Sequence, residues 1–162
     1  MAEVSAIVNS LLYEHGAIRQ YMRTVNSALN EQEEFFLKKS GEWSPSQVEI
    51  LLRNQVNLQH SVTNLEDGLL NHYTREEKEL PPLIGDYLTR ALISEHKEVL
   101  EYLRRARMLL YDTDLKELGR EELMARSYDI RMAIDNARLF IEAHLAKEDA
   151  IIQLLKKALE KS

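Results

Sequence analysis

The chain has no cysteine among its 162 residues, and this absence excludes several kinds of chemistry. Without thiols there are no disulfides, no thiolate metal sites, no iron–sulfur clusters and no CxxCH haem attachment. Any metal that the chain binds must therefore be held by nitrogen and oxygen ligands.

Long hydrophobic runs and clusters of basic residues are lacking as well. No apolar run approaches the roughly 18 residues that a membrane span requires, and the first residues carry neither a basic region nor a signal-peptide cleavage site. Basic residues are scattered among acidic ones in a chain of net charge −6, so no patch attracts phosphate backbones or anionic lipid. We therefore expect a cytoplasmic protein without nucleic-acid or membrane partners.

Strand-like alternation is also absent, whereas the signals for helix boundaries are clear. With 44% hydrophobic residues, the chain has the composition of one domain spanning residues 1–162. The first helix is expected to end at Gly41, and Ser44, Pro45 and Gln47 form a capping box that begins the second. Pro81 and the residue after it end that second helix.

Two further helices follow. The third is expected from Gly85-Asp86 to about residues 111–114, and after a turn at 115–119 the last runs from about Arg120 to Leu159. Short connections make neighbouring helices antiparallel. The predicted fold is therefore all-α, an up-down-up-down antiparallel four-helix bundle.

Each expected helix carries an apolar stripe with residues three or four positions apart, and each stripe contains one histidine. The four stripes are Leu11, His15, Ile18, Met22, Val25 and Leu29; then Leu58, Val62, Leu65, Leu69, His72 and Glu76; then Leu88, Leu92, His96, Val99, Leu103, Ala106 and Leu110; and finally Ile130, Ile134, Ala137, Ile141, His144, Glu148, Ile151 and Leu155.

In the predicted topology these four histidines lie at the same end of the bundle. If about one helix position in three faces the core, four histidines would all do so by chance about once in eighty. The fifth histidine, His60, lies about 18 Å along the helix axis from His72 and cannot join them. A shared polar layer in an apolar core is therefore expected.

This layer has the composition of a two-metal site. Residues at i and i+4 are neighbours on a helix, so His72 with Glu76, and His144 with Glu148, can each offer a nitrogen and a carboxylate to one point. Buried imidazoles and carboxylates need partners, which a metal supplies. Mixed ligands with an open position favour two iron ions with a solvent bridge over manganese or zinc.

The pattern H…HxxxE…H…HxxxE over four helices resembles the haemerythrin HHE cation-binding family. Residues 72–83 resemble its HxxxEExxLxPxL segment, while Glu14-His15 and Glu95-His96 resemble its EH pairs. The resemblance implies a non-haem di-iron centre, oxo- or hydroxo-bridged, that binds dioxygen, nitric oxide or peroxide. The ligands it implies are His15, His72, Glu76, His96, His144 and Glu148.

The chain also departs from the family pattern. Oxygen-carrying haemerythrins have HxxxH on the third helix, whereas Leu100 stands four residues after His96 here. This difference favours sensing, iron handling or a stress response over reversible oxygen carriage. Glu77 and Asp149 compete with Glu76 and Glu148 as ligands, although the stripe geometry favours the latter.

Several alternatives remain open from the sequence. Ferritin-like proteins need Glu-x-x-His, and no glutamate lies three residues before any of the four stripe histidines. A di-iron enzyme or iron donor, acting on peroxide or nitric oxide or in iron–sulfur repair, is the first alternative function. A metal-free helical interaction module is the second. Tyr13 and Tyr73 flank the histidines, and we expect them to point away from the site.

Overall fold

The described part of the chain is almost entirely helical. The computed structural model describes residues 2–38, 43–112 and 118–161, and it contains no strand in those ranges. This confirms the all-α prediction. None of the helices in these ranges has an apolar stretch long enough to cross a bilayer. The helices are α1 (Ala2–Lys38), α2 (Pro45–Glu79), α3 (Pro81–Ile84), α4 (Asp86–Asp112) and α5 (Arg120–Lys161).

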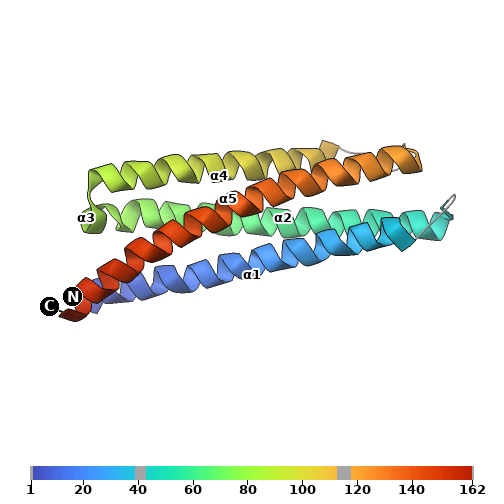
Figure 1. Ribbon diagram of the computed structural model, residues 1–162. Coiled ribbons are helices and arrows are strands. Elements are labelled where there is room, and N and C mark those ends of the chain that lie inside the picture. Colours follow the sequence, from blue (N-terminus) through green and yellow to red (C-terminus); the bar gives the residue numbers. More distant parts are fainter. Residues whose placement is uncertain (1, 39–42, 113–117, 162) are drawn as a thin grey trace.

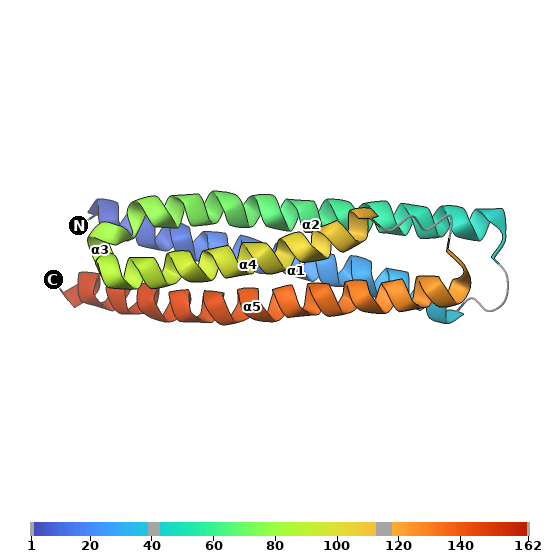
Figure 2. The same cartoon turned by 90° about the horizontal axis from the view of Figure 1, so that it is seen from above.

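The four long helices lie side by side. Helices α1 and α4 each pack against both α2 and α5. Both chain ends and the short helix α3 lie at one end of the molecule, on the left in Figure 1. Helices α1 and α4 run away from this end and α2 and α5 run towards it, as Figure 2 shows from above.

The helix boundaries at α2 follow the local sequence. The Ser44 hydroxyl accepts a hydrogen bond from the backbone N–H of Gln47, and the Gln47 side-chain oxygen accepts one from the backbone N–H of Ser44. The predicted capping box is therefore present. The chain does not turn directly after α2 but forms the extra turn α3, because prolines are tolerated at the start of a helix. Gly85 then adopts a positive φ of 83°, which suits glycine. The expected ends at Gly41 and at 113–117 lie outside the described residues.

Among the described residues, three apolar clusters fill the interior, and a polar layer separates the first two. The longest cluster runs along the middle of the four helices, and a smaller one lies towards α3 and the chain ends. Along α1, Leu11 belongs to the smaller cluster and Ile18 to the longer one, with His15 between them. The same order holds on α4, where His96 lies between Leu92 and Val99. The histidine layer is therefore enclosed by apolar side chains on both sides.

Two details of the predicted stripes are wrong. On α4, Leu88 is 39% exposed and Thr89 is buried in its place, where its hydroxyl donates to the Gly85 carbonyl at 2.7 Å. On α5, Ile152 is fully buried, while Ile151 and Leu155 are only half-buried. A stripe can advance by three or by four residues per turn, and here α5 advances by four after Glu148.

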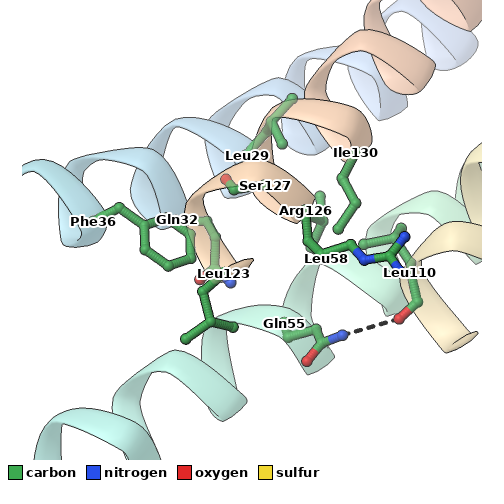
Figure 3. Close-up of a pocket in the computed structure, with 10 residues that line it drawn as sticks. All are labelled: Leu29, Gln32, Phe36, Gln55, Leu58, Leu110, Leu123, Arg126, Ser127 and Ile130. Atoms are coloured by element: carbon green, nitrogen blue, oxygen red, sulfur yellow. Dashed lines mark hydrogen bonds between the residues drawn. The ribbon is translucent and has the colours of Figure 1, made fainter. Parts of the chain in front are cut away.

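A third cluster closes the end of the molecule that is remote from the histidines. Trp43 covers this end and packs against Phe35 and Phe36, with ring centroids 5.5 and 5.6 Å away. Nearby, a cavity of about 10 Å³ is lined by side chains of several helices, and the Gln55 amide donates to the Leu110 carbonyl at its edge at 2.9 Å (Figure 3). Such a volume holds a water molecule at most.

Candidate metal centre

All six residues expected at the site come together in the interior. Helix α1 provides one histidine, α4 another, and α2 and α5 each provide a histidine and the glutamate one turn later. Each of the six is at most 2% exposed. His60, which the helix geometry excluded, is exposed on α2. The residues of the layer are His15, His72, Glu76, His96, His144 and Glu148.

The two glutamates lie between the histidine rings. The Glu148 carboxylate is 3.0 Å from His144 Nε2 and 3.6 Å from His15 Nε2 through Oε1, while its Oε2 is 3.4 Å from His96 Nε2. Glu76 Oε1 contacts His72 Nε2 and lies 4.0 Å from His15 Nε2. Every histidine thus turns Nε2 towards a carboxylate oxygen.

The ligand atoms form two groups, each compact enough to surround one cation. Within each group, the candidate ligand atoms all lie within 4.8 Å of one another. Glu148 belongs to both groups, whereas Glu76 belongs to one. The first group is His15, His72, Glu76 and Glu148, and the second is His96, His144 and Glu148.

A ring of four carboxylates surrounds this layer. Each histidine turns its second nitrogen, Nδ1, to an acidic side chain on an adjacent helix. Partners of this kind fix the tautomer and orientation of metal-binding histidines. The four pairs are Asp149 with His15 at 2.6 Å, Glu14 with His72 at 3.5 Å, Glu77 with His96 at 3.1 Å, and Glu95 with His144 at 2.9 Å.

The two competing carboxylates, Glu77 and Asp149, both lie in this outer ring. Glu77 and Asp149 are each one residue beyond a buried glutamate, and a step of one residue turns a helical side chain by about 100°. They consequently reach Nδ1 of His96 and His15 from outside the layer. In this structure, Glu76 and Glu148 face the interior, and Glu77 and Asp149 support the histidines.

Basic side chains hold three of these outer carboxylates in place. Arg19 binds Asp149 at 2.5 Å, Arg75 binds Glu14 at 2.6 Å, and Lys147 binds Glu95. Each base lies three or four residues after a histidine on its own helix, so it projects beside that histidine and reaches the adjacent helix. The sequence contained the acidic and basic residues but not the pairing, which depends on which helices are neighbours.

Burial and mutual contacts shift the proton affinities in the layer. Burial raises the pKa of Glu76 well above its usual range and lowers the pKa of His72. Burial alone would also raise the pKa of Glu148, but the nearby imidazoles of His144 and His96 lower it. Burial opposes protonation of His144, but the nearby carboxylates of Glu148 and Glu95 raise its pKa. Together these shifts favour retention of one proton by the buried pair of glutamates.

Six atoms that point into the layer make no hydrogen bond in the structure. A buried polar atom without a partner lowers the stability of the fold by about 1 to 3 kcal/mol. Six such atoms in one layer therefore need an explanation. Imidazole nitrogens and carboxylate oxygens are ligands for divalent cations, and a cation between them would satisfy all six. The residues thus fit a metal. The six atoms are Nε2 of His15, His72 and His144, both Glu76 oxygens and Glu148 Oε1.

One neighbour of the layer was placed wrongly from the sequence. Tyr13 is 80% exposed, as expected, but Tyr73 is buried. Its ring stacks on His96 with centroids 3.8 Å apart and meets His144 edge-on at 5.6 Å. Burial, together with the nearby glutamates, raises the pKa of Tyr73, so its hydroxyl stays protonated beside the site. A position next to a histidine was insufficient evidence that the ring points away.

Comparison with known proteins adds no assignment, because no family model, no curated protein and no solved structure matches the chain. The site can hold a metal ion on the evidence of its own donor atoms.

Proposed function

We propose that the chain is a haemerythrin-like protein, an up-down-up-down four-helix bundle that holds two iron ions and binds a small ligand. That ligand is dioxygen, nitric oxide or peroxide, and the role is sensing, iron handling or a stress response. The observation that carries the proposal is the convergence of six buried donor atoms without hydrogen bonds at the level of the histidines.

Two features of the donor set favour a pair of iron ions. The ligand atoms fall into two compact groups that share Glu148, as expected when one carboxylate bridges two cations. With three or four nitrogen and oxygen ligands at each position, an octahedral ion such as iron keeps open places, whereas zinc favours a closed tetrahedron. The metal-free alternative leaves the six donor atoms without partners.

When bound, the iron pair supplies reversible binding of the small ligand at an open position. The residues of this chain hold and protect that position. The outer carboxylates orient the histidines, and the apolar clusters on both sides exclude bulk water. Tyr73 adds a buried, protonated hydroxyl beside His96 and His144.

The sequence of α4 favours a site with four histidines. Leu100, which stands where oxygen-carrying haemerythrins have a fifth histidine, is half-buried and packs against the long apolar cluster. It offers no ligand atom. The proposal therefore places one nitrogen fewer at the His96 position and favours ligand sensing or iron handling over oxygen transport.

Metal analysis tests the proposal directly. We expect about two irons per chain in tag-free protein purified without chelator, with absorption bands of an oxo-bridged ferric pair in air. Mass spectrometry measures the metal, and the near-ultraviolet and visible spectrum reports the bridge. A protein that is purified without metal and takes up none on anaerobic addition of ferrous ion would leave the helical interaction module as its function.

Metal uptake should also depend on pH in a defined direction. The raised pKa of Glu76 favours its protonated form in the metal-free protein, and that proton must leave before the carboxylate can bind a cation. His144, whose pKa is also raised, competes in the same way. The apparent affinity should therefore rise between pH 6 and 8, by about tenfold per pH unit for each proton released.

Calorimetric titration with Co²⁺ in two buffers of different ionisation enthalpy counts the protons released. Glu76→Gln cannot hold the carboxyl proton, so this variant should release about one proton fewer than the unchanged chain. An affinity that is independent of pH in this range would contradict the protonation state assigned to Glu76.

A further inference from the structure

A groove of about 450 Å³ lies between α1 and α5, outside the buried histidine layer. Ligand sites typically have volumes of about 300 to 1,000 Å³, so the space is sufficient for a small organic molecule. None of the lining residues belongs to the two groups of candidate metal ligands. The lining consists of Arg19, Met22, Arg23, Asn26, Ser27, Arg138 and Glu142.

The groove lies where α1 and α5 are not joined by a polar contact. Four residues before Arg23, Arg19 binds Asp149 of α5 at 2.5 Å. Three residues after it, Asn26 accepts a hydrogen bond from Arg138 Nη1 at 3.2 Å. Arg23 itself bonds to a glutamine amide of its own helix, and the described residues contain no bond or ion pair from Arg23 to α5. Contacts at both ends therefore hold the groove, and its middle is open.

The lining carries an excess of positive charge. It contains three arginines and one carboxylate, Glu142, in a chain whose net charge is −6. The carboxylates that pair with Arg19 and Arg138 lie outside the lining. Arginine has five N–H donors, and the contacts among the described residues use at most two nitrogens of each of these arginines. Donors therefore remain for a bound anion.

Arg138 has a donor that lacks an acceptor. Its Nε is buried and makes no hydrogen bond in the structure, while its other two nitrogens contact Asn26 and Asp135. A buried donor without an acceptor is unfavourable. Because Arg138 lines the groove, an oxyanion bound there can supply the acceptor.

The lining residues favour a phosphoryl group that is attached to a polar, non-aromatic molecule. A phosphoryl group has three strong acceptor oxygens, so it can bond to several guanidinium groups at once, whereas a carboxylate has two oxygens. The Asn26 amide and the Ser27 hydroxyl can bond to hydroxyl groups of the same molecule. None of the lining residues is aromatic, so no ring is present to stack on a nucleobase.

We propose that the groove between α1 and α5 binds a small organic phosphate of the sugar-phosphate class, with the phosphoryl group held by Arg19, Arg23 and Arg138. The arginine fork matches the geometry of phosphate oxygens and keeps its charge at every physiological pH. The site is separate from the buried layer and needs no metal, so its test is independent of the proposed function.

Calorimetric titration of the chelator-treated chain with glucose-6-phosphate tests this site. We expect one molecule to bind per chain, with a dissociation constant below about 1 mM. Inorganic phosphate should bind at least about tenfold more weakly, because it lacks the hydroxyl groups that reach Asn26 and Ser27. Glucose should not bind, since it has no phosphoryl group.

Arg23→Gln assigns the binding to the groove. Arg23 is exposed and bonds only within α1, so its replacement should leave the fold intact. We expect the affinity for glucose-6-phosphate to fall at least about tenfold, as for the loss of one charge-assisted hydrogen bond, and Arg138→Gln should act in the same direction. The matched control is Arg53→Gln, which removes the same charge from an exposed position of α2 outside the groove and should bind like the unchanged chain. Circular dichroism verifies equal helix content.

Four results would overturn the assignment. Equal affinity for inorganic phosphate and glucose-6-phosphate would show a site for the free anion, and tighter binding of citrate would show a site for polycarboxylates. Equal weakening in Arg23→Gln and Arg53→Gln would show a general effect of charge rather than binding in the groove. Absence of glucose-6-phosphate binding by the unchanged chain, verified by equilibrium dialysis, would remove the site and leave the proposed metal centre unaffected.

Discussion

Replacing Glu148 by glutamine is expected to empty both metal positions with a single substitution. Glu148 is the one residue that belongs to both groups of candidate ligands, and its two oxygens lie between three of the four histidines. Glutamine has nearly the same shape but only one weakly coordinating oxygen and no charge. We expect the metal content to fall from about two ions per chain to well below one, as measured by mass spectrometry after reconstitution with ferrous ion.

The control is a glutamate-to-glutamine substitution at another position of α5. Glu142 is exposed on α5 and lies outside both groups, so Glu142→Gln should bind metal like the unchanged chain. Circular dichroism should show equal helix content in both variants. If Glu148→Gln still binds two ions, the shared carboxylate is not a ligand, and the geometry of the layer has been interpreted wrongly.

The helices could be predicted because their signals are local. The capping box at Ser44 and the proline after Leu80 act on neighbouring residues, and the structure has helix boundaries at both points. The extra turn α3 was not predicted, because two prolines end one helix and can equally begin another. The choice between Leu88 and Thr89 was wrong because adjacent positions at the start of a helix both fit the stripe.

The buried layer itself also followed from the sequence. A histidine among apolar residues marks a core position on each helix, and the order of the helices brings the four to one end. The outer carboxylates could not be paired in advance, since Glu14 reaches His72 and Glu95 reaches His144 across helix interfaces. Their position directly before a histidine was visible in the sequence and is the signal that could have been used.

Tyr73 shows the limit of reasoning from one helix. A residue adjacent to a buried histidine is turned by about 100° from it, which places it outside the layer on an isolated helix. In the structure that direction faces α4 and α5, where the ring packs on His96 and His144. The packing of three helices, which no single stripe encodes, therefore decides whether such a side chain is exposed.

Metal binding is expected to raise the thermal stability of the folded chain substantially. The layer places two glutamates and four imidazoles between two apolar clusters, and their unpaired atoms reduce the stability of the metal-free protein. An ion present at a thousand times its dissociation constant stabilises the native state by about 4 kcal/mol. For a chain of this size, 1 kcal/mol corresponds to about 2 to 4 °C, so chelation should lower the melting temperature by about 8 to 16 °C.

Differential scanning calorimetry with and without chelator measures this difference. The double variant Glu76→Gln, Glu148→Gln removes both carboxylates that face the layer, so its melting temperature should be the same in both conditions. The comparison separates a metal effect from a general effect of the chelator, because the rest of the chain is unchanged. If the unchanged chain melts at one temperature with and without chelator, the buried layer is a polar element of a metal-free module, and its unpaired atoms are satisfied by ordered water instead.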